Sequence, residues 1–261
     1  MLKIGIIKER KSPPDERVPL SPTQVAQLNK ENLDVKFVIE SSDIRRFKDT
    51  EYTNLGIEVV TDVTDCDILM GVKEVPKEAL IEGKKYFFFS HTIKMQPYNK
   101  ALLQTILRKN IQLMDYECLV NSKNRRLIGF GRYAGIVGCY NAFWALGKRN
   151  HSFDLKPAYL CEDRVEMEGE LSKVKFGEKG LKIALTGNGR VAHGAMEILD
   201  LMNIQKLEVE EYIGYTGNDP VYCQLKVTDY NKRNDNSEGS IREFFNSPEL
   251  YKSDFARFSS N

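Results

Sequence analysis

The sequence predicts an α/β protein whose sheets are mostly parallel. Short apolar segments alternate with polar or amphipathic ones, which is the β-α-β repetition of a parallel sheet flanked by helices. Several apolar segments stop at a charged residue or a histidine, and a glycine-rich turn follows one of them in the second half of the chain. Because ligands bind beyond the carboxyl ends of strands in open α/β sheets, these features favour a ligand-binding protein.

The composition excludes several broad classes. The 261 residues suit one large or two modest domains, and a hydrophobic content of 41% is enough for a core. A net charge of +1 gives no signal for a nucleic acid or membrane partner. Five scattered cysteines without a C-x-x-C motif predict neither a metal site nor disulfides. The start, MLKIGIIKER, does not have the form of a signal peptide, and no apolar run approaches a membrane span, so we expect a cytoplasmic protein.

The chain begins with a strand, a loop and a helix. Apolar character predicts buried strands over 3–8 and 35–39. Between them, Ser21 has the character of a helix N-cap, and Pro22 stands at the first helical position. A helix over 23–32 follows from this arrangement.

Arg17 lies just before that helix, beyond the carboxyl end of the first strand. Arginine grips a carboxylate with two parallel hydrogen bonds, so Arg17 is a candidate for binding a carboxylate of the substrate. The alternative is an ordinary surface ion pair with Glu16 or Asp15, which contributes little to stability.

The stretch from residue 66 to residue 94 carries the strongest signal in the first half. Its apolar runs 67–72 and 85–90 predict two buried strands that are parallel neighbours. The first run ends at Lys73, and the second ends at His91. The two ends are therefore expected to face the same crevice.

Two further charged residues accompany these ends. Glu74 follows Lys73 directly, and Lys94 lies one turn after His91. Together they would place amines, an imidazole and a carboxylate in one crevice. The alternative is that Lys73 and Glu74 form a solvated ion pair and that His91 only terminates its strand.

The next elements continue the same alternation. Apolar residues on one face predict a helix over 97–110, and a strand over 111–114 follows. Acidic residues within 115–117 again stand at a strand end. After a turn, 127–130 is expected to form another strand.

A glycine-punctuated apolar helix is expected over 129–149. Its glycines let another backbone approach closely, at a cost of about 1 kcal/mol each relative to Ala. They serve either phosphate approach or packing, and packing of a buried inter-domain helix is the simpler interpretation. We therefore divide the chain into a substrate domain, 1–130, an inter-domain helix, 131–150, and a linker or loosely structured loop, 151–180.

The second strong signal follows a predicted strand over 182–185. Gly187, Gly189 and Ala192 form a G-x-G-x-x-A motif in a strand–turn–helix context, which is the dinucleotide fingerprint. Gly187 permits the tight turn, Gly189 permits approach of the pyrophosphate, and Ala192 permits close packing of helix on strand. The alternative is a tight turn without a nucleotide.

The identity of the cofactor, NAD or NADP, stays open. The acid that binds the adenosine ribose is expected roughly 20 residues after the turn, where Glu208, Glu210 and Glu211 are all candidates. Arg190 and Lys206 would instead suit a 2′-phosphate, and therefore NADP.

The pattern weakens after residue 212. Only two strands are readable beyond residue 180, although short helices are expected over 240–245 and 248–258. The segment 181–261 therefore predicts a partial dinucleotide-binding domain. The expected fold is two Rossmann-like domains with mostly parallel sheets, the second of them incomplete.

Six motifs together resemble a known family, the lysine-forming saccharopine dehydrogenases. This family includes the lysine–ketoglutarate reductase half of the bifunctional lysine-degradation enzyme, and it belongs with alanine dehydrogenase and transhydrogenase in a wider superfamily. The resemblance covers nearly the whole chain in order, and members continue past this chain's end, so we expect a chain truncated at its C-terminus. The motifs are ERVPLSP (16–22), GVKEVP (71–76), FFFSHTIK (87–94), MDYECLV (114–120), RRLIGFGRYAGIVG (125–138) and TGNGRVAHGA (186–195).

The resemblance implies roles for particular residues and a reaction. An acid/base pair falls on Lys73 and His91. The implied substrate-binding residues are Arg17, Lys94, Arg126, Glu74 and Glu117, of which the two glutamates tune the acid/base pair, and the implied cofactor loop falls on Gly187, Gly189 and Arg190. The implied reaction interconverts saccharopine with L-lysine and 2-oxoglutarate by hydride transfer with NAD(P), through a carbinolamine and an imine.

Two alternatives remain beside that reaction. One is an alanine-dehydrogenase-like amino acid dehydrogenase, and the other is a truncated ligand-binding module without turnover. In each case the expected partner is a small molecule rather than a nucleic acid or a membrane, and the oligomeric state is left open.

Overall fold

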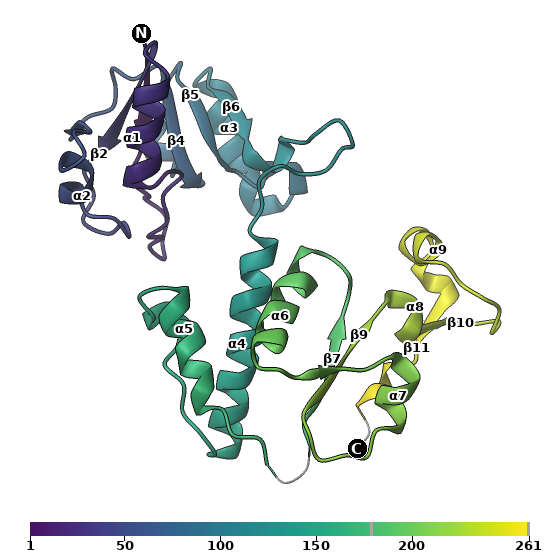
Figure 1. Cartoon of the computed structure of the whole chain (residues 1–261). Helices are drawn as coiled ribbons and strands as arrows, with labels where there is room; N and C mark the ends of the chain where they lie inside the picture. The colour runs from purple at the N-terminus through teal and green to yellow at the C-terminus, as the bar shows by residue number, and fades with distance from the viewer. Residues whose placement is uncertain (178–179, 260–261) are drawn as a thin grey trace. The chain divides into compact units, whose positions relative to one another are not determined.

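A computed structural model describes residues 1–177 and 180–259 of the chain. It divides into two compact units, Met1–Gly129 and Phe130–Asn261 (Figure 1). Residues 178 and 179 of the expected linker, and the last two residues of the expected dinucleotide-binding domain, lie outside the described residues.

The first unit is built on a six-stranded sheet in which all neighbouring strands are parallel. Its strand order is β3-β2-β1-β4-β5-β6. Because all the strands are parallel, their carboxyl ends lie at one edge of the sheet, and each connection crosses back to the other edge. The strands are β1 (Leu2–Ile6), β2 (Val35–Glu40), β3 (Val59–Val60), β4 (Ile68–Lys73), β5 (Lys85–Phe89) and β6 (Gln112–Asp115).

Helices cover both faces of this sheet. The three α-helices of residues 1–129 are α1 (Pro22–Glu31), α2 (Asp49–Thr53) and α3 (Lys100–Arg108). Alternate residues of a strand point to opposite faces. Accordingly, Val38 joins a core with Leu102 and Ile106 of α3, whereas Ile39 joins a second core with Val25 of α1.

The helix α1 confirms its sequence signals. Ser21 is its N-cap and forms a capping box with Gln24, and Pro22 occupies its first position. The Ser21 side chain and the Gln24 side chain thus satisfy N–H groups that the first helical turn leaves without partners.

The strand order also defines where a ligand can bind. The chain runs outward from β1 through β2 to β3, then returns to β4 beside β1 and continues in the opposite direction. Such a reversal opens a crevice outside the carboxyl ends of the two central strands, the topological switch point. In this unit the switch point lies between β1 and β4.

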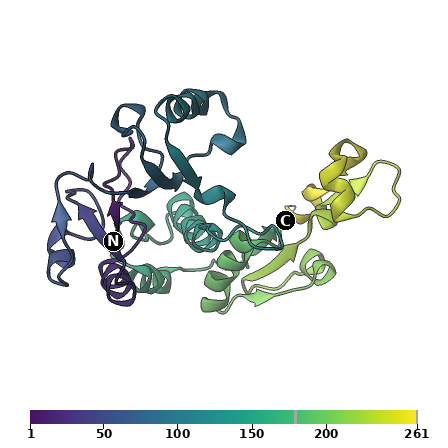
Figure 2. The same cartoon turned by 90° about the horizontal axis from the view of Figure 1, so that it is seen from above.

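The second unit contains a small parallel sheet with strand order β7-β9-β8 and an antiparallel pair, β10 and β11 (Figures 1 and 2). Its strands are β7 (Lys182–Thr186), β8 (Gln205–Lys206), β9 (Val221–Leu225), β10 (Asn231–Arg233) and β11 (Tyr251–Ser253). Its helices are α4 (Gly131–Asn150), α5 (Arg164–Glu170), α6 (Arg190–Leu201), α7 (Val209–Gly214), α8 (Val227–Tyr230) and α9 (Ile241–Asn246).

Gly135 of α4 serves packing against α6, which lies beside it (Figure 1). A Cβ atom at Gly135 would lie 1.8 Å from the Val191 carbonyl oxygen, and one at Gly194 would lie 1.9 Å from the Arg132 carbonyl oxygen. Both distances are far below contact, so each helix needs a glycine where the other's backbone passes. The packing interpretation of the glycine-rich helix is supported.

Three expectations about local structure are wrong. Residues 127–130 form no strand, and an isolated bridge between Val120 and Arg126 is the only pairing the structure describes there. Residues 248–258 form two short 3-10 turns around β11 instead of one helix. Within the expected linker, residues 151–177 are not loosely structured: they include α5, and Met167 packs into the main core of the unit.

No helix within residues 1–177 and 180–259 is both long enough and apolar enough to cross a membrane.

Candidate active site

Charged and aromatic side chains gather at the carboxyl edge of the six-stranded sheet, on both sides of β4. One group follows β5 and β6, and a second group follows β1 and β4. The members of each group come from the segments that follow these strands at the carboxyl edge.

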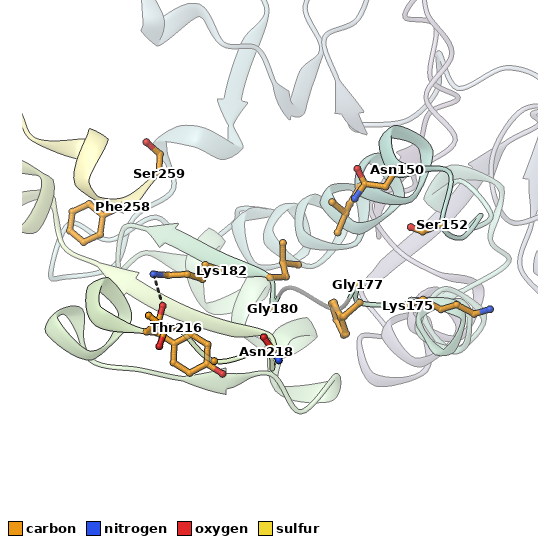
Figure 3. A pocket seen from close by; sticks show the side chains of 15 residues that line it. Asn150, Ser152, Lys175, Gly177, Gly180, Lys182, Thr216, Asn218, Phe258 and Ser259 are labelled. Atoms are coloured by element: carbon orange, nitrogen blue, oxygen red, sulfur yellow. Dashed lines mark hydrogen bonds between the residues drawn. The ribbon is translucent and has the colours of Figure 1, made fainter. Parts of the chain in front are cut away.

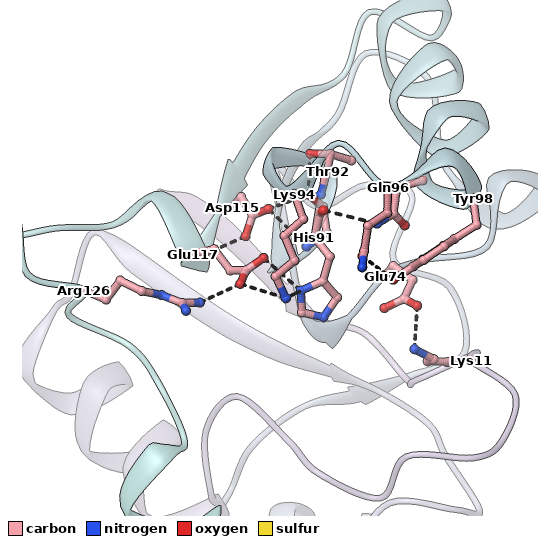
Figure 4. A network of polar contacts seen from close by, with 12 residues as sticks. Lys11, Glu74, His91, Thr92, Lys94, Gln96, Tyr98, Asp115, Glu117 and Arg126 are labelled. Carbon is pink, nitrogen blue, oxygen red and sulfur yellow. Dashed lines mark hydrogen bonds and ion pairs between the residues drawn. The ribbon is translucent and has the colours of Figure 1, made fainter. Parts of the chain in front are cut away.

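The first group is centred on Glu117 (Figure 4). Its carboxylate lies 2.8 Å from His91 Nδ1, 3.4 Å from Lys94 Nζ and 2.8 Å from Arg126 Nη2. The Glu117 side chain is only 5% exposed. Burial alone would raise its pKa, but the hydrogen bonds and charges of His91 and Lys94 outweigh burial, and the pKa of Glu117 is lowered. Glu117 therefore stays ionised and holds three cationic or protonatable groups together.

The same contact sets the chemistry of His91. Nδ1 lies in contact with both the Glu117 carboxylate and the Lys94 ammonium, and in the tautomer whose Nδ1–H donates to Glu117, Nε2 keeps the lone pair that a general base needs. The ring is also stacked on Phe89, with centroids 6.3 Å apart. The imidazole is thus held by a carboxylate at one atom and by a ring at one face.

The backbone around His91 is held by Asp115. His91 has a left-handed conformation, φ 57°, and its carbonyl accepts a hydrogen bond from the Asn99 side chain at 3.2 Å. The buried Ser90 donates to the Asp115 carboxylate from both its hydroxyl and its N–H. The other Asp115 oxygen accepts the N–H of Glu117 at 2.8 Å. Asp115 therefore joins the end of β5 to the turn that carries Glu117.

The second group is centred on a buried glutamate at the switch point. Glu9, which follows β1, accepts N–H bonds from Val72 at 2.6 Å and from Lys73 at 3.0 Å. Burial raises its pKa, and these backbone hydrogen bonds oppose the rise. Glu9 therefore fixes the end of β4 from which the Lys73 side chain projects.

Arg17 and Lys73 are neighbours of one carboxylate, Asp15. Arg17 Nε donates to Asp15 at 2.9 Å, and this contact lowers the pKa of the Asp15 carboxyl, with the charge of Lys73 acting in the same direction. The surface-pair alternative for Arg17 is thus present in the structure. The Arg17–Asp15 ion pair does not remove Arg17 from the neighbourhood of Lys73, and about half of the Arg17 side chain stays exposed.

Tyr116 and Phe89 lie between the two groups. The Tyr116 ring packs on Phe89 at a centroid distance of 5.1 Å, and Phe89 in turn stacks on His91. Burial raises the pKa of the Tyr116 phenol far above its ordinary value, and the charge of Glu9 adds to this. The two groups are therefore parts of one site along the carboxyl edge.

Glu74 presents an unsatisfied acceptor in this site. Lys11 Nζ contacts one of its oxygens at 2.5 Å, and Figure 4 draws this pair. The other oxygen, Oε2, is buried and has no hydrogen-bond partner among the described residues. A buried acceptor without a donor costs about 1–3 kcal/mol, so a ligand N–H would relieve it.

The structure places the expected residues of the first unit along one edge of the sheet, in separate groups, with Glu74 bound to Lys11. His91, Lys94, Glu117 and Arg126 are in direct contact, and Arg17 and Lys73 share the field of Asp15. Their roles in catalysis stay predictions. Sequence reasoning named Asp15 as a possible ion-pair partner of Arg17, but it assigned no positioning role to the other residues that hold the site, which are Glu9, Ser90, Asp115 and Tyr116. The available signal was that two of these acids, Glu9 and Asp115, stand at or directly after strand ends.

The glycine turn of the second unit fits a dinucleotide. Gly187 has φ 93°, in the left-handed region that favours glycine, and Gly189 is the N-cap of α6. A Cβ atom at either position would meet nothing within 4 Å, so both backbones are open to a bulky anion. Ala192 is buried on α6, and Arg190 is the exposed first residue of that helix.

The expected ribose acids are misplaced. The strand that neighbours β7 is β9, and β8 lies one strand further away. Glu208, Glu210 and Glu211 follow β8 at the start of α7, so none of them stands at the end of the strand beside the glycine turn. The order of strands in a sheet does not follow from the sequences of the strands. In addition, β9 was not predicted, because turn-forming residues surround it.

A cavity of 890 Å³ in the second unit lies elsewhere (Figure 3). Residues just before β7 and β9 line it, among them Leu181 and Asn218, and Lys182 Nζ donates to the Tyr215 carbonyl at its wall. These are the amino ends of the strands, whereas the glycine turn follows the carboxyl end of β7. The cavity is therefore separate from the candidate cofactor turn.

His, Cys, Asp and Glu side chains form no group of three or more that would hold a metal ion in the part of the chain that the structure describes.

Fold and site together define a class: two-unit α/β proteins with a charged carboxyl-edge site and a dinucleotide-type turn. Residues 5–137 match the family "Alanine dehydrogenase/PNT, N-terminal domain", and the chain belongs to this family. The match covers most of the first unit, including the whole charged edge.

Relatives support the same assignment. The chain is 31% identical over 219 residues to "Alpha-aminoadipic semialdehyde synthase" of Arabidopsis thaliana. This alignment covers 76% of this chain and 21% of that protein. It is 26% identical over 211 residues to "Saccharopine dehydrogenase [NAD(+), L-lysine-forming]" of Yarrowia lipolytica, covering 76% and 56%. The chain therefore spans less than two thirds of the length of these relatives.

Solved structures show the fold. An L-alanine dehydrogenase matches with a TM-score of 0.56 and 18% identity, covering 86% of this chain and 61% of that chain. The transhydrogenase from Sinorhizobium meliloti matches with a TM-score of 0.54 and 15% identity, covering 84% and 64%.

Proposed function

We propose that this chain carries the acid–base and substrate-binding part, and a cofactor turn, of an NAD(P)-dependent oxidoreductase acting on saccharopine. The observation that supports it most is the His91–Glu117 contact with Lys94 and Arg126 around it. The name of the Yarrowia lipolytica relative, a saccharopine dehydrogenase, contains the same substrate.

The proposed reaction converts saccharopine, water and NAD(P)⁺ into L-lysine, 2-oxoglutarate, NAD(P)H and a proton. The bound nicotinamide would accept hydride from the carbon that joins the secondary amine to the glutarate part. Water then adds to the resulting imine, and the carbinolamine loses lysine as its C–N bond breaks. The protein must bind carboxylates and move protons at nitrogen and oxygen during these steps.

The cations of the edge suit the carboxylates of such a substrate. Saccharopine carries three carboxylates, and Arg17 and Arg126 present guanidinium groups that bind carboxylates in a bidentate manner. Lys94 adds a third positive charge beside His91. The side chains of all three are about half exposed, so the charges face solvent from which a substrate arrives.

Proton transfer would be divided between His91 and Lys73. His91 Nε2 is positioned as the base that deprotonates the attacking water and then protonates the leaving amine. Lys73 would handle the proton on the secondary amine, with its backbone fixed by Glu9. The unsatisfied Glu74 Oε2 would accept an N–H of the substrate amine.

A direct test is the formation of NAD(P)H by the purified chain with saccharopine, compared with L-alanine, and calorimetric titration of saccharopine. The proposal requires saccharopine to bind and to be oxidised faster than alanine. Oxidation of alanine alone would instead support an alanine-dehydrogenase-like enzyme, which the matching family and fold make the second candidate. Binding without hydride transfer would indicate a ligand-binding module.

A further inference from the structure

The strand beside the glycine turn ends in a lysine. Gly187 N–H donates to the Leu225 carbonyl at 2.8 Å, so the end of β9 is bonded directly to the turn. Leu225 is the last residue of β9, and the next residue is the exposed Lys226. In dinucleotide-binding folds, an acid near this point binds the ribose 2′-hydroxyl of NAD, whereas a cation accommodates the 2′-phosphate of NADP.

Two carboxylates on this side of the sheet accept backbone N–H groups. Asp229 accepts the Lys226 N–H at 2.6 Å as part of the cap of α8. Glu211 accepts the Glu208 N–H at 3.2 Å at the start of α7, beyond β8. Neighbouring strands are about 4.8 Å apart, so residues after β8 lie roughly 10 Å from the line of β7, and Lys226 lies roughly half as far.

A second lysine adds positive charge on the same side. Lys206 Nζ donates to Gln224 Oε1 at 3.1 Å, and Gln224 Nε2 donates to the Gly187 carbonyl at 3.0 Å. Lys206 is therefore connected to the turn through one side chain. The Lys226 ammonium makes no hydrogen bond or ion pair among the described residues, so it is available to a ligand.

We propose that Lys226 is a specificity-determining residue that selects the 2′-phosphate of NADP(H) over the 2′-hydroxyl of NAD(H), with Lys206 reinforcing the positive field. This inference rests on the proposed cofactor turn and names the cofactor that the turn accepts. A phosphate at this place gains a charge-assisted contact with the Lys226 ammonium, whereas the carboxylate that could receive a hydroxyl proton, that of Asp229, already accepts the Lys226 N–H.

The test is isothermal titration of the full chain with adenosine 2′,5′-bisphosphate and with adenosine 5′-monophosphate. We expect the bisphosphate to bind at least about 10-fold more tightly. Lys226→Asp should abolish that preference, and Lys226→Arg should keep it. Lys175→Asp makes the same charge change at the amino-end cavity of the unit and should leave the preference unchanged.

The outcomes separate the inference from the proposed function. Equal binding of both nucleotides, or a preference that survives Lys226→Asp, overturns the role of Lys226 while the turn still binds an adenine nucleotide. If neither nucleotide binds, and NADPH and NADH do not bind either, the cofactor turn falls together with the inference.

Discussion

The carboxyl ends of the two parallel sheets are prepared for ligands in different ways. In the first unit, charged side chains arrive already paired, with Glu117 holding His91, Lys94 and Arg126. In the second unit, the open surface is backbone, at Gly187 and Gly189, and the nearby charges belong to flexible lysines. A proton-transfer site needs fixed side chains, whereas an anion site can be built from N–H groups and a helix terminus.

The largest expected effect tests the side chains of the first unit. His91→Asn and Lys73→Met should each lower kcat for saccharopine oxidation by about 100-fold to 10,000-fold, because each removes a general acid–base group. Asn is chosen because it tolerates the left-handed backbone of His91. NADPH absorbance gives the rate, and titration should show unchanged nucleotide binding.

The matched control for this prediction is His151→Asn. His151 has the same left-handed backbone, φ 52°, but it caps α4 in the second unit. It should leave kcat unchanged. If both His91→Asn and Lys73→Met keep the wild-type kcat, neither residue acts as an acid or base in the reaction. The first unit would then have no catalytic role to contrast with nucleotide binding by the second.

The second prediction tests the backbone packing of the other unit. Gly135→Ala places a methyl group 1.8 Å from the Val191 carbonyl oxygen, so α4 and α6 must separate. Overpacking of this kind costs about 1–3 kcal/mol, and backbone overlap belongs at the upper end. Urea unfolding followed by fluorescence of Trp144, the one tryptophan of the chain, reports on this unit.

Gly138→Ala is the internal control on the same helix. A Cβ atom there meets nothing within 4 Å, so the change should stabilise α4 by up to about 1 kcal/mol. The two substitutions should change the free energy of unfolding in opposite directions, although the sizes of the two changes need not be equal. If both variants raise the urea midpoint, the close approach of α4 and α6 is wrong.

Sequence reasoning predicted what depends on local pattern. The strand that ends at Lys73, the N-cap at Ser21 and the turn at Gly187 follow from apolar runs and from residue-specific backbone preferences, whereas the strand before His91 ends two residues earlier than expected, at Phe89. The strand order of the second unit and the positioning role of Asp115 depend on contacts between segments far apart in the chain. The sequence around an acidic residue at a strand end does not distinguish an acid that binds substrate from one that hydrogen-bonds the neighbouring loop.

The smallest expected effect is a pH dependence that sharpens the contrast between the units. The pKa of Glu117 is lowered in the folded chain, where hydrogen bonds and charges from His91 and Lys94 outweigh burial, so its ionised form stabilises the first unit. This stabilisation is present above the unfolded value of about 4.3 and is lost as the pH falls through the lowered folded value.

Glu117→Gln should therefore be less stable than wild type at neutral pH and lose that disadvantage in acid. Hydrogen exchange of β5 and β6 across a pH series measures it within the first unit. Glu78→Gln, an exposed change in the same unit, should track wild type throughout. A stability difference that persists below the lowered pKa would mean that Glu117 stabilises the first unit through packing rather than charge. The site of the first unit would then not depend on the paired charges that distinguish it from the glycine turn of the second unit.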